Sequence, residues 1–239
     1  MAICRVPWAE KEPGKGDFWR WAGIDADTKL VFSHLVGSRK NATGTVFVDD
    51  VASRVKGPVQ IATDKSRSYA CNIRGAFGYE GYSYGTETKV FGEPDTILDS
   101  VRKNGIPPIV TAERKAVVGS PNLGTVTTSH IERVFLSVRQ ECTRFTRLTL
   151  GYSKDLEMHK RAMAPYFGVY NFVRKHKALG TTPAVAAGVE QSRWTLEMVV
   201  EMTETHWQPR HEAQKAANAE ARRAQEDWAF ARAFAEAGI

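Results

Sequence analysis

The sequence has few cysteines and no long hydrophobic run. Its 239 residues include three cysteines, Cys4, Cys71 and Cys142, and no two of them form a CxxC pair. This spacing argues against a zinc ribbon and against a disulfide framework, and it fits a reducing compartment. No apolar stretch approaches the roughly 20 residues needed to cross a bilayer, and the N-terminus has no signal-peptide pattern. We therefore expect a cytoplasmic protein of bacterial type with no membrane partner.

The positive charge is concentrated in one part of the chain. The net charge is +6, with 42% hydrophobic and 25% charged residues, a composition that supports a sizeable core. Between residues 130 and 177 there are ten basic residues against four acidic ones. This stretch alone carries a net charge of +6, so the charges in the rest of the chain sum to zero. A basic surface on a neutral body indicates a polyanionic partner, whereas the alternative is an ordinary solvated helical face.

The first third of the chain has strong secondary-structure signals. Strands are expected at 18–24 and 29–37, joined by the turn residues 25–28 into a hairpin, with Trp19 and Trp21 in the core. Apolar residues at helical spacing predict a helix over 45–55. A short buried strand then follows at 59–63 and ends at Asp64.

The remainder reads as less regular at first and then as helical. After a helix at about 66–73, residues 75–128 are rich in Gly and Pro and predict an irregular insertion with a short strand at 86–91. Residues 130–179 predict helices broken around 149–153, followed by a shorter helix. The tail holds eleven alanines between residues 211 and 237, so its helix propensity is high. This order predicts an α/β fold of mixed α+β type, a mixed sheet flanked by helices with a helical C-terminal tail.

Two acidic residues stand where metal-dependent phosphodiester chemistry would need them. Asp64 ends a buried strand and Glu132 begins a helix, and carboxylates on rigid elements suffice to hold Mg²⁺. Each residue also has a simpler interpretation. Asp64 would cap the helix that follows its strand, and Ser129 with Glu132 would form a capping box in which the glutamate reaches back to the Ser129 amide.

Several runs, in order, resemble the catalytic domain of DDE transposases from insertion sequences, especially the InsB-like type. The run 21–30 is similar to the second and third strands of that domain. The run 60–64 resembles the strand that carries the second catalytic aspartate, and 128–133 resembles the helix start that carries the catalytic glutamate. The similarity continues through 144–154 and closes with 170–183.

The resemblance implies a ribonuclease-H-like catalytic domain over 17–205, between an irregular N-terminus at 1–16 and an Ala-rich helical tail at 206–239. It implies a transposase that cleaves DNA and transfers the strand, with Asp64 and Glu132 as catalytic residues and metal ligands. Two Mg²⁺ (or Mn²⁺) ions are expected as cofactors. The expected partners are double-stranded DNA, as element ends and target, and further copies of the chain in a homo-oligomer. Five basic residues are expected to contact DNA: Arg133, Arg139, Arg144, Arg147 and Lys154.

The sequence departs from the family pattern at the first catalytic aspartate. In the family this residue precedes the hairpin, but residues 1–16 contain no aspartate, and Glu10 and Glu12 are the acids there. The first carboxylate is therefore Asp25, Glu10 or a residue that is missing. Lys65 also replaces the glycine that usually follows the second aspartate. The alternative function is a truncated or domesticated derivative that binds DNA without catalysis.

Overall fold

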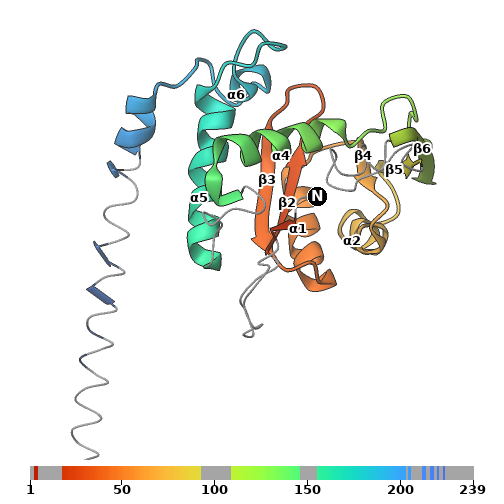
Figure 1. The fold of residues 1–239 in the computed structure, drawn as a ribbon, viewed down its shortest axis with the longest axis horizontal. Coiled ribbons are helices and arrows are strands. Elements are labelled where there is room, and N and C mark those ends of the chain that lie inside the picture. Colours follow the sequence, from red (N-terminus) through yellow and green to blue (C-terminus); the bar gives the residue numbers. More distant parts are fainter. Residues whose placement is uncertain are drawn as a thin grey trace, which may run out of the picture. The chain divides into compact units, whose positions relative to one another are not determined.

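The computed structural model describes residues 3–4, 18–92, 109–145, 155–202, 204–205, 212–213, 216–217, 220 and 223. The chain divides into two units, Met1–Val189 and Glu190–Ile239. All the strands and the helices that surround them belong to the first unit (Figure 1).

The predicted hairpin is confirmed. Strand β2 (Phe18–Ile24) pairs antiparallel with β3 (Val31–Gly37), and the short β1 (Ile3–Cys4) pairs antiparallel with the start of β2. The turn is held by the Asp25 carboxylate, which accepts the amides of Asp27 and Thr28. Asp25 thus has the turn role that its sequence position favours.

A second sheet contains β4, β5 and β6. Strand β4 (Val59–Asp64) runs parallel to β5 (Tyr82–Phe91), and β5 runs antiparallel to β6 (Ile109–Val118). The short strand predicted at 86–91 is part of β5, but the irregular insertion predicted over 75–128 is wrong for the rest of β5 and for β6. Strand β6 is almost wholly exposed, so its ladder with β5, rather than a buried apolar face, makes it a strand.

Two helices cover one face of the hairpin. Helices α1 (Asn41–Arg54) and α2 (Arg67–Phe77) pack on Trp19 and Trp21, which are 6% and 3% exposed. The core position predicted for both tryptophans is confirmed. Gly44 of α1 allows close approach, because a Cβ there would lie 3.2 Å from the Trp21 ring.

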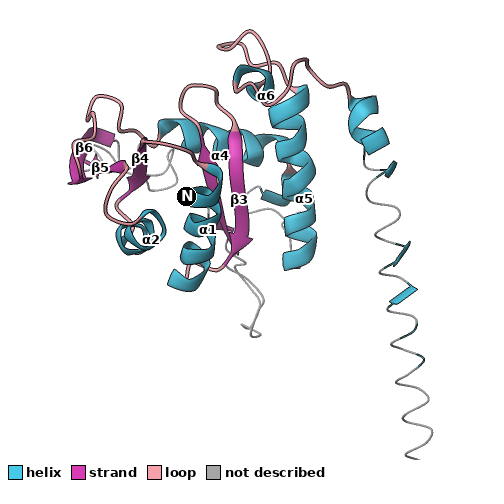
Figure 2. Cartoon of the chain, turned by 180° about the vertical axis from the view of Figure 1, so that it is seen from behind, coloured by secondary structure: helices cyan, strands magenta, loops and turns pink. Residues whose placement is uncertain are grey.

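The opposite face of the hairpin is covered by helices from the second half of the chain. These are α4 (Ser129–Glu141), the 3₁₀ turn η1 (Thr143–Phe145) and α5 (Leu156–Gly168), which runs into the π-helical turn η2 (Val169–Val173). Figures 1 and 2 show α4 and α1 on opposite sides of β2 and β3. Since successive residues of a strand point to opposite faces, the tryptophans meet α1 while Ala22 and Ile24 pack with the α4 and α5 cluster. The mixed α/β class predicted from the sequence is confirmed.

One buried side chain ties η2 to the hairpin. Asn171 accepts the amide of Val31 at 3.0 Å and donates to the Val31 carbonyl at 2.8 Å, so it pairs with β3 much as a neighbouring strand would. Downstream, Thr182 caps the short helix α6 (Pro183–Ala186) by accepting the Val185 amide, with Pro183 in its favoured first-turn position.

In the second unit, residues 196–202 are helical, and the described residues of the Ala-rich tail are helical as well. The high helix propensity of the tail explains why these residues are helical, because alanine is the strongest helix former. Within the described part of the chain, no helix has both the length and the apolar character that a membrane span requires.

Candidate active site

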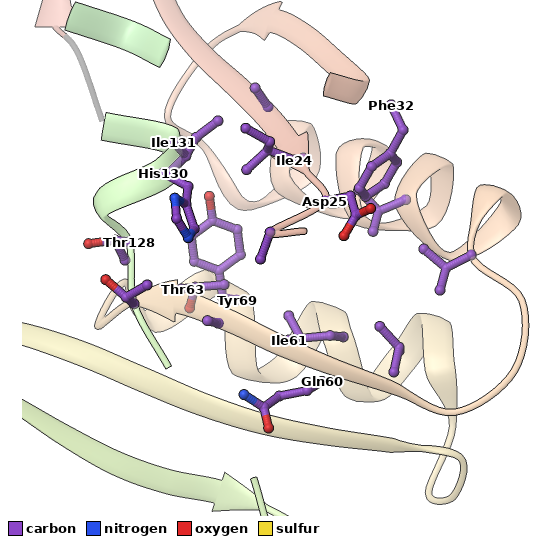
Figure 3. A pocket seen from close by; sticks show the side chains of 18 of the residues that line it. Ile24, Asp25, Phe32, Gln60, Ile61, Thr63, Tyr69, Thr128, His130 and Ile131 are labelled. Carbon is purple, nitrogen blue, oxygen red and sulfur yellow. The ribbon is translucent and has the colours of Figure 1, made fainter. Parts of the chain in front are cut away.

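A cavity of about 870 Å³ lies beside β2 and β4. Its wall comes from the end of β2 and the turn after it, the length of β4, parts of α1 and α2, and the start of α4 (Figure 3). Asp64 and Glu132 both line this cavity, and so does Asp25. Residues that are 68 positions apart in the sequence therefore line one space.

Asp64 is the last residue of β4 and is half-buried. Its Oδ1 accepts the Ser66 amide at 3.2 Å, and Ser66, not Asp64, is the N-cap residue of α2. Asp64 therefore shapes the turn between strand and helix without capping the helix itself. Nearby, burial and the Asp64 charge raise the pKa of Tyr69, so this phenol stays protonated.

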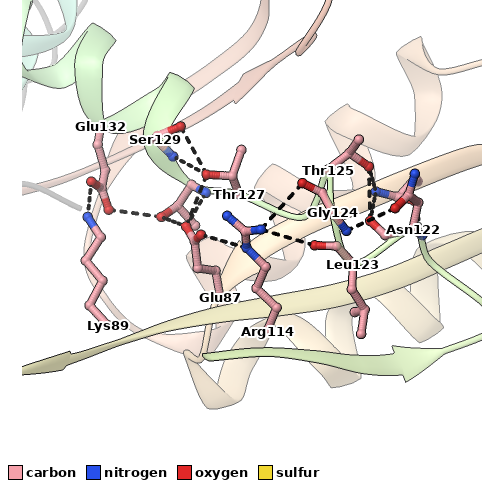
Figure 4. Close-up of polar contacts among 12 residues, drawn as sticks. Glu87, Lys89, Arg114, Asn122, Leu123, Gly124, Thr125, Thr127, Ser129 and Glu132 are labelled. Atoms are coloured by element: carbon pink, nitrogen blue, oxygen red, sulfur yellow. Dashed lines mark hydrogen bonds and ion pairs between the residues drawn. The ribbon is translucent and has the colours of Figure 1, made fainter. Parts of the chain in front are cut away.

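Glu132 lies in the first turn of α4, but the expected capping box is not formed. The N-cap residue is Thr128, and the Ser129 amide donates to Thr127 Oγ1 at 3.2 Å. Glu132 instead accepts the Thr128 hydroxyl at 3.0 Å and forms an ion pair with Lys89 of β5 (Figure 4). Its carboxylate is thereby directed toward the second sheet.

A third carboxylate, that of Glu87 of β5, was not predicted from the sequence. Its side chain is 5% exposed, and its oxygens accept the Thr128 amide at 2.7 Å, the Thr128 hydroxyl at 2.9 Å and Arg114 Nε at 3.2 Å. Burial alone would raise the pKa of Glu87, but these donors outweigh it and the net pKa is lowered. Glu87 is therefore an anion that anchors the start of α4.

Glu87 also connects the two predicted residues. It lies directly opposite Asp64 in the parallel β4–β5 register, and it shares the Thr128 hydroxyl with Glu132. Glu87 falls in the short strand predicted at 86–91, but no motif distinguishes its carboxylate from the other acids of the sequence. Its position beside Asp64 follows only from the parallel pairing of β4 with β5.

The cavity offers a small set of donors for a metal ion. Among the described residues there is no group of three or more His, Cys, Asp or Glu side chains that could hold a metal ion. Mg²⁺ keeps several waters and is held in many proteins by one or two carboxylates, and Asp64 and Glu132 are the residues on the cavity wall that would hold one. The two-ion arrangement stays a prediction.

Of the two residues proposed as the first carboxylate, only Asp25 lies among the described residues. Burial opposes ionisation of Asp25, but its bonds to Thr28 and Asp27 outweigh burial and lower the pKa of the carboxyl group. It is thus a charged turn residue on the wall of the cavity. Glu10 lies outside the described residues.

The structure describes three of the five basic residues that were predicted to contact DNA. Arg133, next to Glu132, and Arg144, in η1, are exposed, while Arg139 lies in the last turn of α4. Arg147 and Lys154 lie outside the described residues. Part of the basic stretch is neutralised by two ion pairs, Lys160 with Glu157 and Arg174 with Glu141.

Comparisons of the chain with family models, with curated proteins and with solved structures gave no match.

Proposed function

We propose that the protein is a DDE-type transposase with a ribonuclease-H-like catalytic domain, which cleaves DNA and transfers the strand with the help of divalent metal ions. The observation that carries this proposal is the common cavity of Asp64 and Glu132. An acidic residue at a strand end and another in the first turn of a helix line that cavity, next to the basic stretch that begins at Arg133. The runs that resemble insertion-sequence transposases supply the reaction class.

Asp64 and Glu132 would hold Mg²⁺ or Mn²⁺, which in such sites activates the attacking oxygen and stabilises the leaving one. Two neighbouring residues, Thr128 and Lys89, set the position of the Glu132 carboxylate. Thr128 orients one oxygen of Glu132, and the Lys89 ammonium takes the position of a counter-charge at the other. When the carboxylate turns to a metal, Lys89 becomes available to pair with a DNA phosphate as a point charge.

The direct test is metal-dependent cleavage of a labelled duplex that carries the element end, with Mg²⁺ and with Mn²⁺. We expect nicking that falls at least about a hundredfold in Asp64→Asn and in Glu132→Gln, since each change removes an anionic ligand that stabilises charge in the transition state. Glu157→Gln, an exposed acid in the first turn of α5, is the matched control and should cut like the wild type. Nicking that survives both active-site changes would refute the proposal.

A second candidate is a DNA-binding protein that has lost catalysis. The observation in its favour is the engagement of Glu132 by Lys89, together with the lack of a metal-binding cluster among the described residues. This candidate predicts duplex binding with no cleavage in either metal, and the same affinity for the wild type and Glu132→Gln. A metal-dependent nick that Glu132→Gln removes would exclude it.

A further inference from the structure

Strand β6 is an edge strand with an exposed surface. Among the described strands the sheet has the order β4-β5-β6, so β5 pairs with one edge of β6 and no described strand pairs with the other (Figure 4). All ten residues of β6 are described and nine of them are exposed, and the exposed fraction is 69% for Val110 and 45% for Val117. An open edge with apolar side chains beside it is a template for a further strand.

The sequence of β6 is nearly symmetric about Arg114. Glu113 precedes this arginine and Lys115 follows it. When two copies of the strand pair antiparallel about a two-fold axis at Arg114, positions at equal distances on either side of the axis lie opposite each other. Glu113 then faces the partner's Lys115, and Lys115 faces the partner's Glu113. The residues farther out also match in size and type: Ala112 with Ala116, Thr111 with Val117, and Val110 with Val118.

Charge favours this register over its two neighbours. Residues that lie opposite each other must point to the same face of the sheet, and side chains alternate between faces, so the axis passes at a residue and not between two. With the axis at Glu113 two glutamates would meet, and with the axis at Lys115 two lysines would meet. Like charges directly opposite each other destabilise a strand pair, whereas opposite charges stabilise it. Of these three registers, the one centred on Arg114 forms two ion pairs.

The arginine on the axis is neutralised within its own chain. Arg114 Nε donates to the Glu87 carboxylate at 3.2 Å. Because side chains alternate, Glu113 and Lys115 lie on the other face of the sheet, where 54% and 66% of their side chains are exposed and their charged atoms are 3.6 Å apart. An exposed pair of this kind contributes little within one chain, so both side chains can turn to a second copy.

We propose that β6 is a self-association edge, at which two copies of the chain pair antiparallel about Arg114 and join their second sheets. Backbone pairing is centred on 112–116, because the β5–β6 ladder is regular from 111 to 116 and shifts register beyond it. Since so short a stretch pairs, the dimer dissociates on dilution and dilute samples contain the monomer. Glu113 and Lys115 are not among the residues that line the cavity, so this proposal and the proposed function can fail separately.

Sedimentation equilibrium of the full chain, without metal or DNA, measures the association. We expect the wild type to shift from monomer to dimer as its concentration rises. The dissociation constant should increase at least about tenfold in Glu113→Lys and in Lys115→Glu, because each change places two pairs of like charges opposite each other. A wild type that stays monomeric at every concentration would overturn the proposal, and this is the result expected if the edge receives a different polypeptide.

Mixing the two variants tests the register itself. In a mixed pair every charge at these positions faces an opposite charge, so an equimolar mixture should dimerise at concentrations at which each variant alone is monomeric. Glu157→Lys and Lys160→Glu, which reverse the charges of an exposed ion pair on α5, are the matched controls and should associate like the wild type. A mixture that associates no more than its components would contradict the proposal.

A second measurement covers the case in which a variant does not fold, which circular dichroism detects. Hydrogen exchange of the wild type at low and high concentration then decides. Amides at 112–116 should exchange more slowly at high concentration, because an added strand binds the outer edge of β6. Slowing confined to other elements, or no change with concentration, would overturn the proposal.

Discussion

At the scale of single residues, Glu87 and Glu132 compete for one hydrogen-bond donor. Both carboxylates accept from the Thr128 hydroxyl, which has a single hydrogen to give. Glu87 is also bound by the Thr128 amide and Arg114, whereas Glu132 has the flexible Lys89 as its cation. Glu87 is therefore the fixed member of the pair, and Glu132 is the one that can change partners.

Replacing the fixed member should cost stability. In Glu87→Gln the neutral amide no longer pairs with Arg114, and its NH₂ group cannot accept from Thr128. We expect the free energy of unfolding to fall by about 1–3 kcal/mol, as for other buried polar groups left without partners. Urea denaturation measures this, with the exposed Glu113→Gln on β6 as control.

The pH profile adds a second readout for the same residue. Because the pKa of Glu87 in the fold lies below its ordinary value of 4.5, the wild type should lose this contribution only as the pH falls below that value. Equal stability of Glu87→Gln and the wild type near pH 7 would contradict the anchoring role.

His159 predicts a different pH dependence. It is fully buried beside Phe145, and burial, with Arg20 and Arg144 nearby, lowers its pKa from 6.5 to about 4. The unfolded chain therefore binds a proton that the fold does not between these values, so stability is present above pH 6.5 and is lost toward pH 4. The expected slope from this group is about 1.4 kcal/mol per pH unit.

The comparison that isolates His159 is thermal or urea unfolding of the wild type and His159→Leu at several pH values between about 4.5 and 7.5. The leucine variant should show a shallower loss of stability on acidification. Parallel profiles for the two proteins would show that the pKa of His159 is the same in the folded and the unfolded chain.

At the scale of secondary-structure elements, sequence signals worked where an element buries one face against the core. The hairpin, β4 and the core positions of Trp19 and Trp21 follow from alternation and turn residues, and α1 follows from helical spacing. The signals identified only 86–91 of β5 and missed β6. Strand β6 buries almost nothing, so it has no periodic pattern to detect, and it exists because β5 offers a complete ladder.

Two helical glycines test the packing of α1 and α2. A Cβ on Gly44 would lie 2.9 Å from the Asn72 amide nitrogen and 3.2 Å from the Trp21 ring, whereas a Cβ on Gly75 would meet nothing within 4 Å. Alanine is a better helix former than glycine by about 1 kcal/mol. We therefore expect Gly75→Ala to raise the unfolding midpoint in urea.

Gly44→Ala should lower the midpoint, because the same gain in propensity is offset by overpacking, which typically costs about 1–3 kcal/mol in cores. The two variants are matched, since both change one helical glycine by one methyl group. A midpoint raised equally in both would mean that α1 does not pack closely on Trp21.

At the scale of the whole molecule, the cavity is the feature that no sequence pattern announces. It lies where β2 of one sheet and β4 of the other line the same space, and among the described strands β4 pairs only with β5. Asp64 and Glu132 were predicted individually from their positions at element ends, but their common cavity depends on how α4 crosses the hairpin. The homo-oligomer and the role of the Ala-rich tail stay predictions.

The basic stretch predicts salt-sensitive DNA binding. If several exposed arginines contact phosphates, duplex affinity should fall about tenfold or more between roughly 50 and 200 mM salt, through counterion release. Replacing both Arg133 and Arg144 with Gln should flatten the dependence by up to about two phosphate contacts, whereas Lys115→Gln on β6 should leave it unchanged. Fluorescence anisotropy across a salt series measures the slope, and a flat wild-type response would rule out a phosphate-binding surface.

The proposed binding of one divalent cation by Asp64 and Glu132 is tested most directly by affinity cleavage. Fe²⁺ replaces Mg²⁺, and ascorbate with peroxide then generates radicals that cut the backbone next to the bound ion. We expect two cuts, one near the end of β4 and one near the start of α4, both suppressed by excess Mg²⁺ and both lost in Asp64→Asn. A single cut, or cuts elsewhere in the chain, would show that the two carboxylates do not share a metal.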